Sequence, residues 1–311
     1  MDWDKVSTIA RTQFLFISIT SALFVIIGAF GNIISFIIFN NKLLKNQLSA
    51  NYIKGSIVMN MITIFYLPII LFSPIWILNS ATCKIYNGIF GIIIQIQAWV
   101  TALSSIDRMV SVLKPHSCLF KNKLIFQLFA MILSALILFI LLLPQFIYYD
   151  IGIKNSIIVC MYKEEWARDY LRVEFALFRA IIPFILMIIS SITITIKMSR
   201  AKANLTLSVD RKREKNLFKS LIASDIFFIL FRLPYLIYIL TNQDESGIFS
   251  FLYAILTAIG TSNNVFIFII FILFNKLYKQ LFIKYMRRCK KLNEEMIKPP
   301  RIQEVIQVSV L

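Results

Sequence analysis

Seven long apolar segments dominate this sequence and leave few folds open to it. Each is close to the ~20 residues that an α-helix needs to cross a bilayer. Hydrophobic residues make up 59% of the 311 and charged residues only 16%, a balance typical of a chain solvated mainly by lipid. The sequence therefore predicts an all-α membrane protein, a bundle of seven transmembrane helices. The segments cover residues 13–39, 52–78, 85–106, 124–149, 173–196, 217–241 and 248–274.

The distribution of basic residues predicts the orientation of the bundle. With residues 1–12 outside and residues 292–311 as the cytoplasmic tail, 24 of the 33 Lys and Arg residues fall on the cytoplasmic side, in or beside the loops and after the seventh span. The first segment is too long for a cleaved signal peptide and reads as a signal anchor within a membrane domain spanning 13–275. Basic residues beside the membrane ends attract anionic lipid, which accounts for the net charge of +17 without a nucleic-acid partner.

Residues 276–291 change from a continuous apolar run to an amphipathic pattern. Leu277, Leu281 and Tyr285 recur at helical spacing, opposed by lysine and arginine, which predicts a short eighth helix in the membrane interface. Cys289 near its end is a candidate for palmitoylation.

The other three cysteines lie outside this helix. In the predicted orientation Cys83 and Cys160 face the outside, where a disulfide can form, whereas Cys118 faces the cytoplasm. Sequence does not give the distance between the outer two, so a bridge and two free thiols both stay open. His116 is the only histidine, which disfavours a metal-dependent intramembrane enzyme, and no cofactor is expected.

Short motifs occur in a fixed order along the seven segments. They are Gly31-Asn32, Leu67-Pro68, Trp76 seven residues before Cys83, Asp107-Arg108-Met109, Pro115, Pro183, Phe228 and Phe231-Arg232-Leu233-Pro234. In this order and spacing they resemble the rhodopsin-like (class A) family of G-protein-coupled receptors over nearly the whole chain, and most of all its divergent invertebrate peptide or orphan receptors.

The sequence also departs from the family pattern. Asn60 stands where the family has its sodium-binding aspartate, Arg232 where it has a tryptophan, and Ser191 where it has a tyrosine. The Asn-Pro-x-x-Tyr motif of the seventh helix is replaced by residues 267–271. These changes predict modified switching machinery.

The resemblance implies roles for several charged residues near the cytoplasmic side. Arg108 would be held by Asp107 and by Glu214 at the start of the sixth helix, and its release would expose it to a G protein, with Pro115 in the adjoining loop. The alternative is that these are ordinary boundary charges that reach lipid headgroups.

On the outer side, the resemblance implies a bridge between Cys83 and Cys160 that clamps a loop over a ligand pocket. Two intramembrane arginines at pocket depth, Arg179 and Arg232, would then meet an anionic group of the ligand. The alternative is internal pairing, of Arg232 with Asn263 or Asn264 for example, and the same holds for Glu174 and Asp225. The expected pocket residues are Phe90, Ile94, Arg179, Arg232 and Tyr235.

These features together predict a plasma-membrane receptor without enzymatic activity, signalling through a heterotrimeric G protein. A neuropeptide is the favoured ligand, and a small, possibly anionic, chemosensory molecule is the alternative. Phe90 stands where monoamine receptors carry an aspartate, which disfavours an amine. A transporter or channel using the intramembrane charges is the competing class. Ser309, Val310 and Leu311 at the end of the chain resemble a PDZ ligand.

Overall fold

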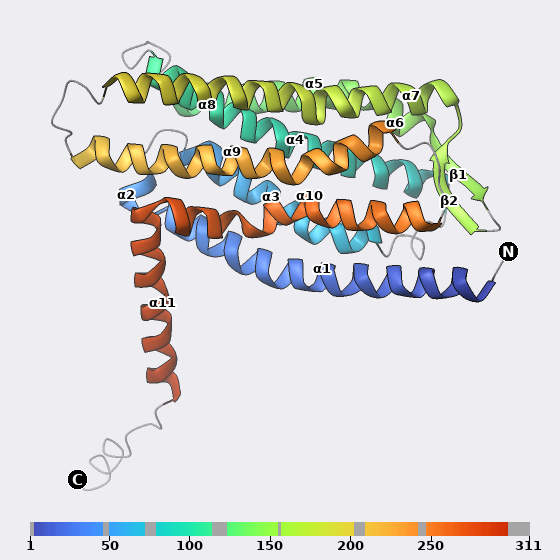
Figure 1. Cartoon of the computed structure of the whole chain (residues 1–311), viewed down its shortest axis with the longest axis horizontal. Helices are drawn as coiled ribbons and strands as arrows, with labels where there is room; N and C mark the ends of the chain where they lie inside the picture. The colour runs from blue at the N-terminus through green and yellow to red at the C-terminus, as the bar shows by residue number, and fades with distance from the viewer. Residues whose placement is uncertain are drawn as a thin grey trace, which may run out of the picture.

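The computed structural model describes residues 3–45, 50–71, 79–113, 123–154, 157–201, 209–241 and 247–297, and shows a bundle of long helices running side by side (Figure 1). The long helices of the bundle are α1 (Trp3–Phe39), α3 (Ala50–Leu71), α4 (Ser80–Leu113), α5 (Lys123–Leu141), α8 (Ile182–Ala201), α9 (Val209–Thr241) and α10 (Gly247–Phe274). The shorter elements and the last helix are α2 (Lys42–Lys45), α6 (Leu143–Tyr148), β1 (Tyr149–Lys154), β2 (Ile157–Tyr162), α7 (Glu165–Glu174), the π-helix η3 (Phe175–Ile181) and α11 (Lys276–Ile297).

Most of the predicted spans are present as helices long and apolar enough to cross a membrane. Six such stretches lie within the described residues, in α1, α4, α5, the continuous helix from α7 to α8, α9 and α10. The remaining predicted span contains α3, whose 22 residues extend about 33 Å at 1.5 Å per residue. The prediction of a seven-helix bundle with a further C-terminal helix is confirmed.

Two helix boundaries differ from the sequence prediction. The fourth predicted span does not continue to residue 149, because the helix ends at Leu141 and a new short helix begins beside Pro144. The fifth helix begins at Glu165, well before the predicted residue 173, since α7, η3 and α8 follow one another without a break. The region between is an antiparallel hairpin in which Ile151 is paired with Cys160, where the sequence indicated only a loop.

The two ends of the bundle differ in character. Figure 1 shows the β1–β2 hairpin near the N-terminus of α1 at one end, and α2 with the start of α11 at the other. We refer to these as the hairpin end and the α11 end. At the α11 end an apolar cluster joins α1, α3, α9, α10 and α11, and Tyr278 of α11 shares a hydrogen bond of 2.7 Å with Ser35 of α1.

Polar and apolar residues are distributed as a lipid solvent requires. Amide side chains such as Asn32, Gln97 and Asn264 are buried inside the bundle, whereas Ile125 and Leu273 are about two-thirds exposed on its outer face. A polar group facing hydrocarbon would lack hydrogen-bond partners, so such groups gather where helices meet. Gly31 permits one such close contact, because a methyl group there would overlap the ring of Phe268 on α10.

Candidate functional site

A buried ion pair joins α4 and α9 in the half of the bundle nearer the α11 end. The Arg108 guanidinium, 1% exposed, lies 3.5 Å from the carboxylate of Asp225. Its Nη2 also donates to the Ser105 hydroxyl at 2.7 Å, and its Nε donates to the Ser104 carbonyl at 3.0 Å. Asp225 accepts further hydrogen bonds from Ser105 at 2.9 Å and from Ser191 on α8 at 3.2 Å. Three helices are therefore tied together through one carboxylate.

Of the two acidic residues that the sequence assigned to Arg108, only Asp107 can be compared with the structure. Asp107 is buried on a different side of α4 and accepts a hydrogen bond of 3.3 Å from Gln127 on α5. Glu214 belongs to α9, but its side chain lies outside the described residues, as does Pro115. Asp225 was not expected at this site from the sequence. The sequence does indicate that Asp225 has a role, because it is an isolated carboxylate within the apolar sixth span.

A network of amide side chains occupies the centre of the bundle. Gln97 on α4 donates to Asn60 on α3 at 2.7 Å and to Asn264 on α10. Its Oε1 accepts a hydrogen bond of 3.0 Å from Arg232 Nη2 on α9. Asn60 in turn donates weakly to Asn32 on α1, at 3.4 Å. Arg232 is thus held internally, through Gln97 and not directly through Asn263 or Asn264.

Replacing Arg232 by Gln tests this assignment. The change breaks the bond to Gln97 and leaves space beside Gly260, which the Arg232 stem approaches. We expect a loss of roughly 1 to 3 kcal/mol in stability and lower surface expression. Agonist potency of the receptor that reaches the surface should stay within about threefold of wild type, since Arg232 is not among the residues lining the cavity described next. A large potency loss at normal thermal stability would place Arg232 in the ligand site instead.

A cavity of about 590 Å³ opens at the hairpin end, where α4, α7, η3 and α9 meet the hairpin. Of the expected pocket residues, Phe90, Arg179 and Tyr235 line the cavity. Ile94 and Arg232 are buried in the bundle and are not part of its lining. Its lining carries charges of both signs. The basic residues are Lys163, Arg168, Arg172 and Arg179, and the acidic ones are Glu164, Glu165 and Glu174.

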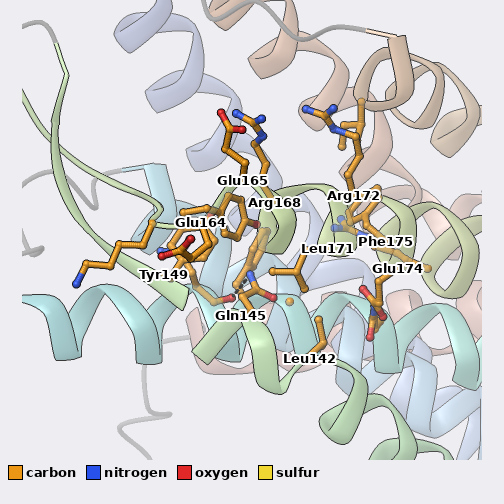
Figure 2. Close-up of a pocket in the computed structure, with 18 of the residues that line it drawn as sticks. Leu142, Gln145, Tyr149, Glu164, Glu165, Arg168, Leu171, Arg172, Glu174 and Phe175 are labelled. Atoms are coloured by element: carbon orange, nitrogen blue, oxygen red, sulfur yellow. Dashed lines mark hydrogen bonds between the residues drawn. The ribbon is translucent and has the colours of Figure 1, made fainter. Parts of the chain in front are cut away.

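The inner wall of the cavity is built by the π-helix and the residue before it. Glu174, the last residue of α7, is 4% exposed and accepts a hydrogen bond from Gln95 Nε2 on α4. The Arg179 guanidinium lies 4.1 Å from the centroid of the Phe175 ring and 5.6 Å from that of Tyr235. Single-turn π-helices are often found at functional sites, because the wider turn changes the direction of side chains. In Figure 2 Glu174 points toward α4, whereas Glu165 and Arg168 extend to the opposite side.

The rim of the cavity is fixed by the hairpin. Lys163 lies 2.7 Å from the Asp150 carboxylate, and the pKa of Asp150 lies well below its ordinary value because Lys163 and Ser80 hydrogen-bond to its charged form. Cys83 at the start of α4 is fully buried and disulfide-bonded. The Cys160 side chain lies outside the described residues, and we propose it as the partner.

Replacing Cys83 by Ser is expected to lower the stability of the folded receptor by about 2 to 4 kcal/mol, because the cross-link that restricts the unfolded chain is lost. Surface expression and agonist response should fall together. Cys289, which is free and exposed, provides the matched control: Cys289→Ser should leave the stability of the bundle unchanged. Peptide mass spectrometry under non-reducing conditions checks the pairing, and free thiols at both Cys83 and Cys160 would contradict it.

Comparison with known proteins agrees with this arrangement. The sequence matches the family described as 7 transmembrane receptor (rhodopsin family) over residues 14–274, more than half of the chain. The chain therefore belongs to the rhodopsin family of seven-transmembrane receptors, a family of signalling proteins without enzymatic activity. The sequence matches no curated protein. Among the residues that the structure describes, no group of His, Cys, Asp and Glu is placed to hold a metal ion.

Proposed function

We propose that this class A receptor lies in the plasma membrane with its N-terminus outside, and that its ligand is a neuropeptide bound at the hairpin end. The observation that supports a peptide most is the cavity itself, an open space of about 590 Å³ with four basic and three acidic residues in its lining. A peptide carries charges of both signs together with apolar side chains, and it can meet such a lining at several points.

Signal transmission in this proposal uses the ion pair between Arg108 and Asp225. A ligand that binds one arrangement of the helices more tightly shifts the population toward it. Separation of α9 from α4 would release Arg108, whose Nη1 is buried and has no hydrogen-bond partner among the described residues. The freed guanidinium then faces a heterotrimeric G protein in a cleft at the α11 end.

Two alternatives remain relevant to the test. A chemosensory receptor for a small anionic molecule is favoured by one observation, the presence of Arg179 in the cavity lining. The family match is to receptors and does not support a transporter or channel.

Contacts outside the bundle complete the proposal. The amphipathic face of α11 would lie against membrane lipid, with Cys289, exposed on that helix, as the palmitoylation site. A PDZ protein would bind Ser309, Val310 and Leu311, which lie outside the described residues.

A pooled screen of peptides and metabolites in cells carrying a promiscuous G-protein reporter tests the ligand class. We expect responses to peptide pools that disappear in the Arg108→Ala receptor at matched surface expression. Responses confined to small carboxylates or phosphates, and lost in Arg179→Gln, would identify the chemosensory alternative. Ligand-evoked ion flux without any G-protein response would contradict the receptor proposal.

A further inference from the structure

The inner wall of the cavity holds a buried carboxylate beside an amide oxygen that has no hydrogen-bond partner among the described residues. Glu174 and Gln95 are both more than nine-tenths buried, and both line the cavity. A side-chain hydrogen bond joins them, donated by Gln95 Nε2 to Glu174 Oε1. Gln95 Oε1 has no hydrogen-bond partner among the described residues.

The orientation of the Gln95 amide follows from the carboxylate beside it. An amide nitrogen donates and a carboxylate oxygen accepts, so Nε2 must face Glu174 and Oε1 must point elsewhere. A buried acceptor without a partner costs free energy, and such groups in native proteins call for an explanation. A ligand group that donates hydrogen bonds to Oε1 and to the carboxylate at once would supply the missing partner.

The geometry points to a cationic nitrogen with N–H donors, and we propose that a protonated amine or a guanidinium of the ligand binds between Glu174 and Gln95. This inference rests on the proposed function in placing the ligand in the cavity. A carboxylate already buried in the bundle favours a cation over a neutral donor, because charge-assisted hydrogen bonds are the stronger ones. Arg179 lies in the same lining, stacks on Phe175 and places a positive charge near Glu174. A ligand cation must therefore approach Glu174 from the side of Gln95.

Phe90 is compatible with a cationic ligand group in this cavity. Its place in the sequence disfavours an amine, because the aspartate of monoamine receptors is missing there. In the structure the carboxylate comes from Glu174 on another helix, and Phe90 also lines the cavity. A peptide offers such a cation either as its amino terminus or as a lysine or arginine side chain.

Thermal unfolding of the purified full-length receptor, with three small probes at millimolar concentration, tests the proposal. Phenylalaninamide carries a free α-amine, N-acetylargininamide carries a guanidinium as its only cation, and N-acetylphenylalaninamide carries no charge. We expect one or both cationic probes to raise the Tm and the neutral probe to have little effect. The cation that acts identifies the source, amino terminus or side chain.

Glu174→Gln is the decisive variant, because it keeps the shape of the side chain and removes its charge. The affinity for the active probe should fall about tenfold or more, and Gln95→Met should weaken it severalfold. Asp169→Asn on the same helix is the control for the loss of a carboxylate, since Asp169 is exposed, lies outside the cavity lining and pairs with Arg168 and Arg172 instead of Gln95. It should leave the shift unchanged.

Equal stabilisation of wild type and Glu174→Gln, equal stabilisation by the neutral probe, or no shift by either cation would overturn the proposal. None of these measurements requires a G protein. Probe binding that depends on Glu174 therefore supports the cation site even if coupling fails, and coupling without such binding supports the receptor function alone.

Discussion

Replacing Asp225 by Asn is expected to raise basal G-protein signalling and to destabilise the receptor. Asn keeps the shape and one acceptor oxygen for Ser105 and Ser191, but it removes the charge that faces Arg108 at 3.5 Å. Leaving one member of a buried ion pair without its partner costs typically 3 to 5 kcal/mol, and we expect about 3 because part of the hydrogen bonding persists. If about 1.4 kcal/mol of the pairing favours the closed arrangement over the open one, the open population rises tenfold.

Two control variants sharpen this prediction. Ser191→Ala removes one hydroxyl donor to the same carboxylate but leaves the ion pair in place, so it should cost less, about 1.5 kcal/mol, the lower end for hydrogen bonds to charged groups. Glu214→Gln tests the position that the family resemblance implied. Basal nucleotide exchange is measured at matched surface expression. A rise in Glu214→Gln with no rise in Asp225→Asn would place the restraint on Arg108 at Glu214.

The second large effect is expected from Arg108. Arg108→Ala should abolish coupling while agonist binding at the opposite end of the bundle stays within about threefold of wild type. The single change also strands the Asp225 carboxylate in the interior, where it lies 3% exposed, so a loss of 3 to 5 kcal/mol in stability is expected.

The double variant Arg108→Ala with Asp225→Ala separates folding from signalling. Removing both members of the buried pair leaves no charge stranded in the interior, so the Tm should recover part of the way toward wild type, the remaining loss coming from the cavity that the two alanines leave. Coupling should remain absent, because the guanidinium that meets the G protein is gone. Coupling restored together with stability would show that Arg108 contributes to folding only.

Much of the architecture could be predicted because the hydrophobic pattern fixes where helices lie. The apolar segments locate the spans, and the change of pattern after residue 275 locates α11. The β1–β2 hairpin and the early start of α7 were missed. Each strand has only six residues, and those of β2 are apolar throughout, so no alternating pattern runs through both strands of the hairpin. The sequence of α7 is polar enough to be taken for a loop, although the helix continues directly into η3.

The site was predicted less completely, because pairing partners come from other helices. Arg108 was located from its motif, but its partner Asp225 is 117 positions away in the sequence. Asp225 also lies 11 residues after Glu214 on the same helix, about three turns at 3.6 residues per turn. Gln97 was missed as the partner of Arg232 because a neutral amide gives no charge signal in a sequence. Glu174 was recognised as an intramembrane charge, but only the structure shows that it lines the cavity and accepts a hydrogen bond from Gln95.

Guanine-nucleotide exchange on a reconstituted heterotrimeric G protein tests the central claim, that this bundle transmits a signal through the Arg108–Asp225 pair. Full-length receptor in lipid vesicles is compared with Asp225→Asn and with the double alanine variant. The account predicts basal exchange above that of empty vesicles for wild type, faster exchange for Asp225→Asn and none above background for the double variant. Equal exchange by all three proteins, or exchange that persists without Arg108, would contradict it.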